Sequence, residues 1–225
     1  MKKAVFFDLF FTLANLEYQS ENEFTLLNIS RQEWEASAEN ADVYQQRATG
    51  KLKTERQMLE SMVDGLPFSV SENQLEKLVE IRNNRYQKSL TDIHPDILST
   101  LKELKESGIK LCLVSNADII DKKYWGISPL KEYFDAVIFS CDVGIVKPDG
   151  KIYQLATEKL NVSAADSIFA GDGGSNELYG AKAAGMATVL TEFLTQKDRQ
   201  TKEKIAESAD YIISDFKEIL NIVKK

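Results

Sequence analysis

Short hydrophobic runs alternate with helical patterns over most of the chain. Six runs rich in strand-favouring residues predict β-strands over residues 3–8, 110–114, 136–139, 167–170, 187–190 and 211–213. Helical spacing of hydrophobic residues predicts helices over 95–106, 150–160 and 176–184. Strands that alternate with helices indicate right-handed βαβ units and a parallel sheet.

Residues 15–90 interrupt this alternation with a pattern that is helical throughout. Thr54 and Ser71 each begin a capping box with a glutamine three residues later, and Gly65 ends the first of these two helices. Ser30 is a third helix start, before a segment that carries Trp34 and Ala38 and could extend to Val43. The block therefore has the composition of a small helical bundle.

The fold class that follows is α/β, a Rossmann-like three-layer core with a parallel sheet and an inserted helical bundle. We expect the core to comprise residues 1–14 and 91–225, and the inserted domain to comprise residues 15–90. At 225 residues with 43% hydrophobic content, the chain can bury a core of this size.

Polar residues stand where several predicted strands end. Asp8 ends the first strand, Ser115 and Asn116 follow the second, and Asp172 follows the fourth. Ligands of open parallel sheets bind at the carboxyl ends of the strands. Asp8 is thus a nucleophile, a metal ligand or a helix cap, and the residue alone leaves these three roles open.

These residues, taken in order, resemble the four motifs of the haloacid dehalogenase (HAD) superfamily. Asp8 and Thr12 match the first motif, D-x-D-x-T, and Ser115 matches the second. Lys147, followed by proline, matches the third, and the Gly171-Asp172 loop matches the fourth. The resemblance implies a hydrolase, and it implies that the helical block is a cap over the active site.

The resemblance also implies catalytic roles. Asp8 would attack a phosphoryl group and form an aspartyl-phosphate, while Lys147 would supply a fixed positive charge near the transferring group. Ser115 would donate a hydrogen bond to the phosphoryl oxygens, with Asn116 assisting in substrate binding. Thr12 would hydrogen-bond locally and hold the turn.

A carboxylate that attacks a phosphate dianion meets like-charge repulsion, which a hard cation such as Mg²⁺ relieves. The family's ligand set implies that Asp8, Asp172 and the backbone carbonyl of Phe10 hold this Mg²⁺. Glu177 would bind the metal through water or anchor Lys147. Alternatively, Asp172 and Ser175 would only cap the following helix.

The chain departs from the first motif at Phe10, where the phosphatase branch has a second aspartate that serves as general acid and base. Phenylalanine can do neither, and a general acid is typically worth ~10²–10⁴-fold in rate. The leading hypothesis is therefore a Mg²⁺-dependent hydrolase of a small phosphorylated metabolite that has a good leaving group or is hydrolysed slowly.

Two alternatives stay open. An aromatic residue at Phe10 also resembles the metal-independent 2-haloacid dehalogenase branch, which would need no protonation of a leaving halide. That branch lacks the acid found here at Asp172, and only Arg31 and Arg47 are candidates for its substrate-binding arginine. The third hypothesis is a non-catalytic descendant that binds a phosphorylated ligand or a protein.

Charge and composition limit the partners. A net charge of −7 and a pI of about 5.0 argue against general nucleic-acid binding. No segment is long and hydrophobic enough to span a membrane, so we expect a cytoplasmic protein, either a monomer or a homodimer, with a small-molecule substrate. Cys112 and Cys141 are expected to be buried thiols, and the single histidine, His94, is expected in a loop at a helix start.

Overall fold

Six parallel strands form one sheet, which confirms the predicted α/β fold class. The computed structural model describes residues 2–225. The strand order is β3-β2-β1-β4-β5-β6, and every neighbouring pair is parallel. The strands are β1 (Ala4–Phe7), β2 (Lys110–Ser115), β3 (Ala136–Phe139), β4 (Ser167–Gly171), β5 (Ala187–Thr191) and β6 (Tyr211–Ile213).

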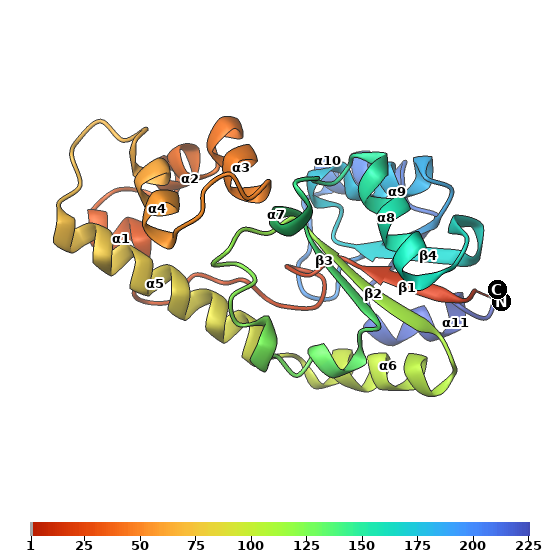
Figure 1. Cartoon of the computed structure of the whole chain (residues 1–225). Coiled ribbons are helices and arrows are strands. Elements are labelled where there is room, and N and C mark those ends of the chain that lie inside the picture. Colours follow the sequence, from red (N-terminus) through yellow and green to blue (C-terminus); the bar gives the residue numbers. More distant parts are fainter. Residues whose placement is uncertain (1) are drawn as a thin grey trace.

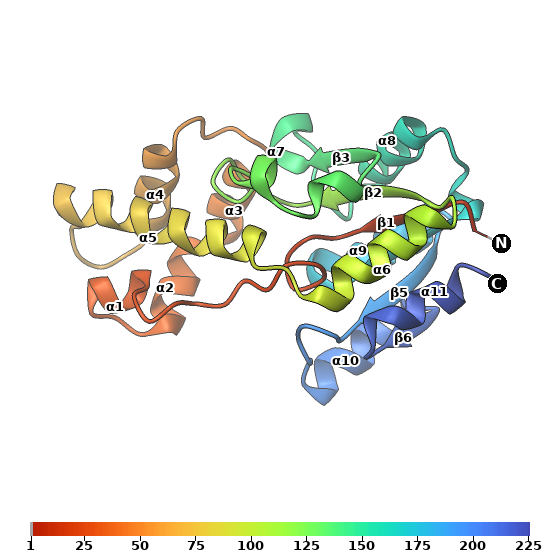
Figure 2. The same cartoon turned by 90° about the horizontal axis from the view of Figure 1, so that it is seen from below.

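Strand β1 lies at the centre of the sheet because all four of its residues are hydrophobic and fully buried. Val5 and Phe7 face the hydrophobic cluster that also contains residues of α6 (Pro95–Glu106) and α11 (Ile219–Ile222). Ala4 and Phe6 point to the other face, toward residues of α8 (Gly150–Leu160) and α9 (Glu177–Ala183). Figures 1 and 2 show these helix pairs on opposite faces of the sheet, which gives the core three layers.

Three core helices lie close to the predicted segments: α6 (Pro95–Glu106), α8 (Gly150–Leu160) and α9 (Glu177–Ala183). The core also contains α7 (Ser140–Val143), α10 (Arg199–Ala206) and α11 (Ile219–Ile222), which lie outside the predicted segments. Short 3₁₀ turns are η1 (Trp125–Ile127), η2 (Lys131–Tyr133), η3 (Ala164–Asp166), η4 (Gly174–Asn176) and η5 (Phe216–Glu218). Helix α10 has no buried residue, and Ile205 and Ala206 are its only hydrophobic residues, so the spacing of hydrophobic residues does not predict it.

The inserted block consists of five helices that stand to one side of the sheet (Figure 1). They are α1 (Glu23–Leu27), α2 (Arg31–Ala38), α3 (Ala41–Ala48), α4 (Glu55–Val63) and α5 (Glu72–Thr91). Trp34, Met58 and Leu78 belong to a hydrophobic cluster formed largely by these helices. The block therefore has a core of its own.

The helix starts in this block follow the sequence closely. Ser30, Thr54 and Ser71 all form complete capping boxes. The extension of the Ser30 helix to Val43 is wrong, because α2 ends at Ala38 and Asn40 caps the separate helix α3.

A buried ion cluster joins the helical block to the core. Asp118, in the loop after β2, accepts hydrogen bonds from Arg47 of α3 at 2.7 Å and from Arg82 of α5 at 3.2 Å. Arg82 also donates to Asp121 at 2.9 Å. Asp118 and Arg82 are each 1% exposed, so the pairing takes place out of water. The division of the chain into domains at residues 15 and 90 stays a prediction.

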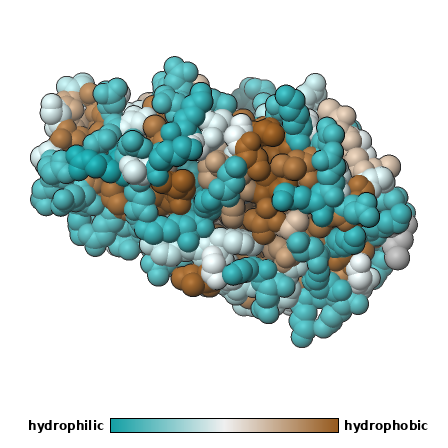
Figure 3. Space-filling model, in the orientation of Figure 1, coloured by the Kyte–Doolittle hydropathy of each residue, from teal (hydrophilic) through white to brown (hydrophobic). Residues whose placement is uncertain are grey.

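The surface and the cysteines add two smaller findings. The face in Figure 3 is largely hydrophilic, with hydrophobic residues gathered in limited groups. In residues 2–225, no helix has the length and hydrophobicity needed to cross a membrane. Both cysteines are free, and Cys112 is buried as predicted. The prediction is wrong for Cys141, which is only half-buried because it lies in the first turn of the short helix α7.

Removing one charge from the buried ion cluster tests its contribution to stability. Asp118→Asn leaves Arg47 and Arg82 without their shared anion, and breaking a buried pair in this way costs about 3–5 kcal/mol. The matched control is Glu39→Gln, which removes the half-exposed partner of Arg47 and is expected to cost about 1 kcal/mol or less. Chemical denaturation measures both, and equal losses would contradict a structural role for the cluster.

Candidate active site

The predicted site residues meet at the point where the strand order reverses. Strands β2 and β4 flank β1 on its two sides, and connections to them run in opposite directions from this point. Asp8 follows β1, Asp172 follows β4, and Ser115 is the last residue of β2. In doubly wound sheets this crevice is where ligands bind.

A tight turn after β1 sets the position of Asp8. The Leu9 carbonyl accepts hydrogen bonds from the N–H groups of Leu13 at 2.8 Å and Ala14 at 2.9 Å. Phe11 takes a left-handed conformation with φ of 62°, which costs a non-glycine residue about 1–2 kcal/mol. Thr12 Oγ1 donates to Asp8 Oδ2 at 3.2 Å, as the prediction of a local hydrogen bond requires. Strain of this kind concentrates at functional sites.

Lys147 connects two carboxylates. Its Nζ donates to Asp8 Oδ1 and to Glu177 Oε2, both at 2.5 Å. Asn116 holds the main chain of Lys147, accepting from its N–H at 2.7 Å and donating to its carbonyl at 3.1 Å. Burial alone would lower the pKa of Lys147, but the two carboxylates raise it well above its usual value, so the lysine stays charged.

The Glu177 carboxylate lies directly over the fourth-motif loop. Its Oε1 accepts from the Gly173 N–H at 3.1 Å. A Cβ atom at Gly171 would stand 2.0 Å from the same oxygen, so only glycine fits there. Of the two roles considered for Glu177, the structure shows the contact with Lys147. The capping alternative is wrong for Ser175, because α9 has no side-chain cap.

Three carboxylates converge in this small volume. One oxygen from each of Asp8, Asp172 and Glu177 lies within 4.8 Å of the others, and all three residues are buried. Burial and the neighbouring aspartates raise the pKa of Glu177 to about 8, and burial also raises the pKa of Asp8. Clustered carboxylate oxygens are the ligand chemistry of hard divalent cations.

Two further features stand beside these acids. Within residues 2–225, the buried Ser115 Oγ has no hydrogen-bond partner, which leaves it free for a ligand oxygen. Lys197 Nζ donates to Asp172 Oδ2 at 2.5 Å. No sequence motif singles out Lys197, because it lies in the irregular segment before α10.

A cavity of about 770 Å³ opens between the helical block and the core. Phe10 and Asn116 line it on the side of the acids, and Tyr18, Arg31 and Arg85 line it on the side of the block. Both charged and aromatic side chains therefore line this wall. Its size suits a small molecule rather than a macromolecule.

The sequence and solved-structure comparisons agree with this geometry. The haloacid dehalogenase-like hydrolase family matches residues 2–185. The chain belongs to this family. It is a HAD-like hydrolase, as the motif order predicts.

Similar proteins include phosphatases. Glyceraldehyde 3-phosphate phosphatase of Methanocaldococcus jannaschii is 26% identical over 208 residues, 75% of this chain and 87% of that protein. The enzyme of the same name from Methanothermobacter thermautotrophicus is 33% identical over 135 residues, 56% of this chain and only 58% of that protein. These relatives favour a phosphatase over a dehalogenase.

A solved dehalogenase shares the fold. L-2-haloacid dehalogenase from Xanthobacter autotrophicus superimposes with a TM-score of 0.67 at 21% identity, covering 100% of this chain and 99% of that chain. At this identity the likeness describes the architecture and carries no statement about substrate.

In this HAD-like hydrolase, the position of the missing second aspartate is filled by a packed aromatic ring. The Phe10 ring stands edge-on to the ring of Tyr86 in α5, with centroids 5.2 Å apart. Phe10 therefore joins the first-motif turn to the helical block, where a carboxylate would face the cavity.

The arginines of the helical block have acidic partners of their own. Arg31 donates to Glu35 at 2.7 Å, and Arg47 donates to Glu39 at 2.8 Å as well as to Asp118. Neither of the two arginines considered as a haloacid ligand is thus an unpaired cation.

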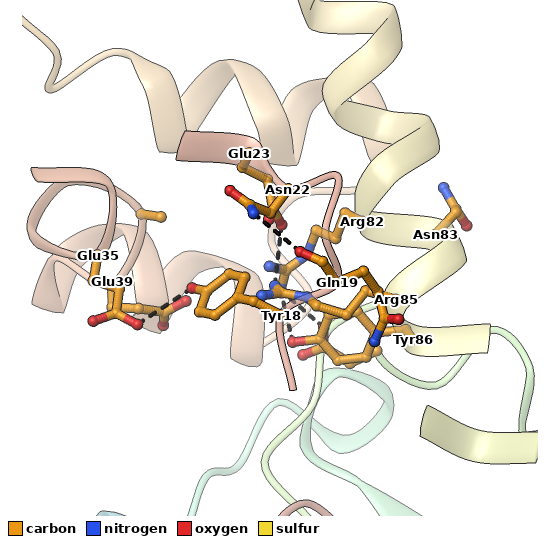
Figure 4. A network of polar contacts seen from close by, with 12 residues as sticks. Tyr18, Gln19, Asn22, Glu23, Glu35, Glu39, Arg82, Asn83, Arg85 and Tyr86 are labelled. Atoms are coloured by element: carbon orange, nitrogen blue, oxygen red, sulfur yellow. Dashed lines mark hydrogen bonds and ion pairs between the residues drawn. The ribbon is translucent and has the colours of Figure 1, made fainter. Parts of the chain in front are cut away.

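Arg85 is a third arginine on this wall, and no motif in the sequence identifies it. Its guanidinium lies 4.3 Å from the ring centroid of Tyr18 and 5.4 Å from that of Tyr86. Glu23 pairs with it at 3.1 Å. Figure 4 shows this network of arginines, acids and tyrosines spread across the helical block.

Replacing the first-motif acid separates catalysis from folding. Asp8→Asn should reduce turnover of 4-nitrophenyl phosphate to background, because an amide cannot act as the nucleophile. Its melting temperature should stay equal or rise, since the raised pKa of Asp8 means that folding disfavours the ionised carboxylate.

The control for this variant is Asp166→Asn. Asp166 precedes β4 and so lies at the opposite end of the sheet, where it pairs with Lys3. It should keep full turnover. Near wild-type turnover in Asp8→Asn would remove Asp8 as the nucleophile.

Proposed function

We propose that this HAD-like hydrolase is a Mg²⁺-dependent phosphatase of small phosphorylated metabolites, with Asp8 as its nucleophile. The observation that carries the proposal is the buried group of Asp8, Asp172 and Glu177 around Lys147. A nucleophile, a second acid and a fixed cation at one crevice suit phosphoryl transfer.

The first chemical step is attack of Asp8 on phosphorus. One carboxylate oxygen forms a bond to phosphorus while the ester P–O bond breaks, and the leaving oxygen departs with the bonding electron pair. Water then attacks the phosphorus of the aspartyl-phosphate, which releases phosphate and restores the Asp8 carboxylate. Thr12 positions the carboxylate through its 3.2 Å hydrogen bond.

Two side chains handle the charge that develops on the phosphoryl oxygens. Lys147 supplies a positive charge that Asn116 holds in place through the main chain. Ser115 has a free, buried hydroxyl and donates to one of the oxygens. Asn116 thus acts as a positioning residue.

The donor set fits a magnesium ion. Asp8, Asp172 and the backbone carbonyl of Phe10 would hold it, while Glu177 accepts hydrogen bonds from Lys147 and from the Gly173 N–H and so anchors the lysine beside the ion. When bound, Mg²⁺ supplies the charge neutralisation that lets an anionic nucleophile approach a phosphate dianion.

The helical block of residues 15–90 serves as the cap in this proposal. Phe10, Tyr86 and Arg85 make the wall that meets the leaving group. Because Phe10 cannot protonate a leaving oxygen, the preferred substrates carry leaving groups that are stable as anions.

A dehalogenase remains the second candidate, and Phe10 is the observation that favours it. Displacement of halide from carbon needs no acid at this position. Asp172 weighs against it, because a second buried carboxylate beside the nucleophile repels a haloacid carboxylate. If the protein hydrolyses neither phosphate esters nor haloacids, the third hypothesis, a binding protein without turnover, is favoured.

Restoring the acid tests the role of Phe10. In Phe10→Asp, kcat/KM for alkyl phosphates should rise toward the ~10²-fold low end of general-acid catalysis. The value for 4-nitrophenyl phosphate should change little, because its leaving group departs as a stable anion.

Phe10→Asn is the matched control, since it has the same size and polarity without an ionisable proton. It should lose the packing against Tyr86 equally and gain no activity on alkyl phosphates. No selective gain in a folded, Mg²⁺-bound Phe10→Asp protein would favour the dehalogenase or binding alternatives.

A further inference from the structure

The ion pair between Lys197 and Asp172 has no role in the chemistry described above. Lys197 Nζ lies 2.5 Å from Asp172 Oδ2, while Asp172 Oδ1 accepts from the Gly174 N–H at 3.0 Å. Both oxygens of this carboxylate are therefore occupied. Asp172 is 5% exposed, so these two partners take the place of the water that would otherwise solvate its carboxylate.

Charge balance explains why a cation stands there. Asp8, Asp172 and Glu177 bring three acidic groups together, and Lys147 reaches only Asp8 and Glu177. Asp172 would be left as a buried carboxylate without a cationic partner, which is costly. The Lys197 ammonium, at the end of a flexible side chain, supplies this cationic partner.

We propose that Lys197 acts as a built-in substitute for the metal at Asp172, and that a divalent cation binds by displacing its ammonium. The proposal rests on the proposed metal site. Two cations cannot both sit against Asp172 Oδ2, since they repel each other at such short range. The divalent cation and the Lys197 ammonium then compete for the Asp172 carboxylate.

The position of Lys197 links this competition to the substrate cavity. Leu194, Thr195 and Gln196 precede it directly and line the cavity. On its other side, Ile205 of α10 packs so closely on Gly173 that its Cγ2 stands 2.5 Å from where a Cβ would lie. Release of Lys197 would therefore remove one anchor of the segment that forms one wall of the cavity.

Calorimetric titration with Mg²⁺ tests the displacement. Lys197→Gln should bind Mg²⁺ more tightly than the wild type, by about tenfold if the ion pair is closed nine-tenths of the time. Lys202→Gln is the matched control, because it removes the same charge from the same region. Lys202 pairs with Glu192 and makes no contact with Asp172.

The outcomes separate the inference from the function on which it rests. Displacement is supported if Lys197→Gln binds Mg²⁺ more tightly than both the wild type and Lys202→Gln. The same holds if Lys197→Gln binds Mg²⁺ and the wild type binds none. Equal affinities in wild type, Lys197→Gln and Lys202→Gln overturn it but leave the metal site intact. Absence of Mg²⁺ binding in all three proteins overturns both.

Hydrogen exchange supplies a second readout that does not depend on activity. Saturating Mg²⁺ should speed the exchange of residues 193–198 in the wild type, because the ion pair that holds them is broken. In Lys197→Gln the segment should exchange rapidly with or without Mg²⁺. Unchanged exchange in a Mg²⁺-saturated wild type would overturn the displacement.

Discussion

The compensation of buried negative charge is the constraint on which the site depends. Three acids converge at the carboxyl ends of β1 and β4, where burial raises the pKa of Asp8 and of Glu177. The Lys147 ammonium compensates this charge, because its Nζ donates to both Asp8 and Glu177 at 2.5 Å. The neighbouring residues of the site hold this lysine and these acids in position.

Several neighbouring residues hold these charged groups in place. Both ends of the Asn116 side-chain amide hydrogen-bond to the main chain of Lys147, which fixes the position of its Cα atom. Tyr153 donates to the Glu177 carbonyl at 2.7 Å, which holds the start of α9. Gly171 leaves room for the Glu177 carboxylate. An arrangement with so few free polar atoms is preorganised for charge that develops during reaction.

Local sequence signals predicted much of the fold and of this site. A fully hydrophobic strand before Asp8, polar residues at strand ends and capping boxes in the helical block all act over a few residues. The sequence indicates Glu177 as a possible anchor for Lys147, and their contact joins the start of α9 to the loop after α7.

Long-range pairing was harder to predict. Arg47 and Asp118 lie 71 residues apart, and nothing near either residue identifies its partner. Lys197 lies in an irregular segment with no hydrophobic period, so its approach to Asp172 appears only in three dimensions. Such contacts depend on the packed fold, not on local propensity.

In the proposed mechanism, Asp8 carries the phosphoryl group during turnover. This step can be tested by acid quenching during hydrolysis of 4-nitrophenyl phosphate in ¹⁸O-labelled water, followed by mass spectrometry of the peptide that contains Asp8. We expect a phosphorylated Asp8 whose carboxylate holds no heavy oxygen, since water attacks phosphorus. Heavy oxygen in the Asp8 carboxylate, without phosphorylation, would contradict it, because water would then have attacked the carbonyl carbon of an ester.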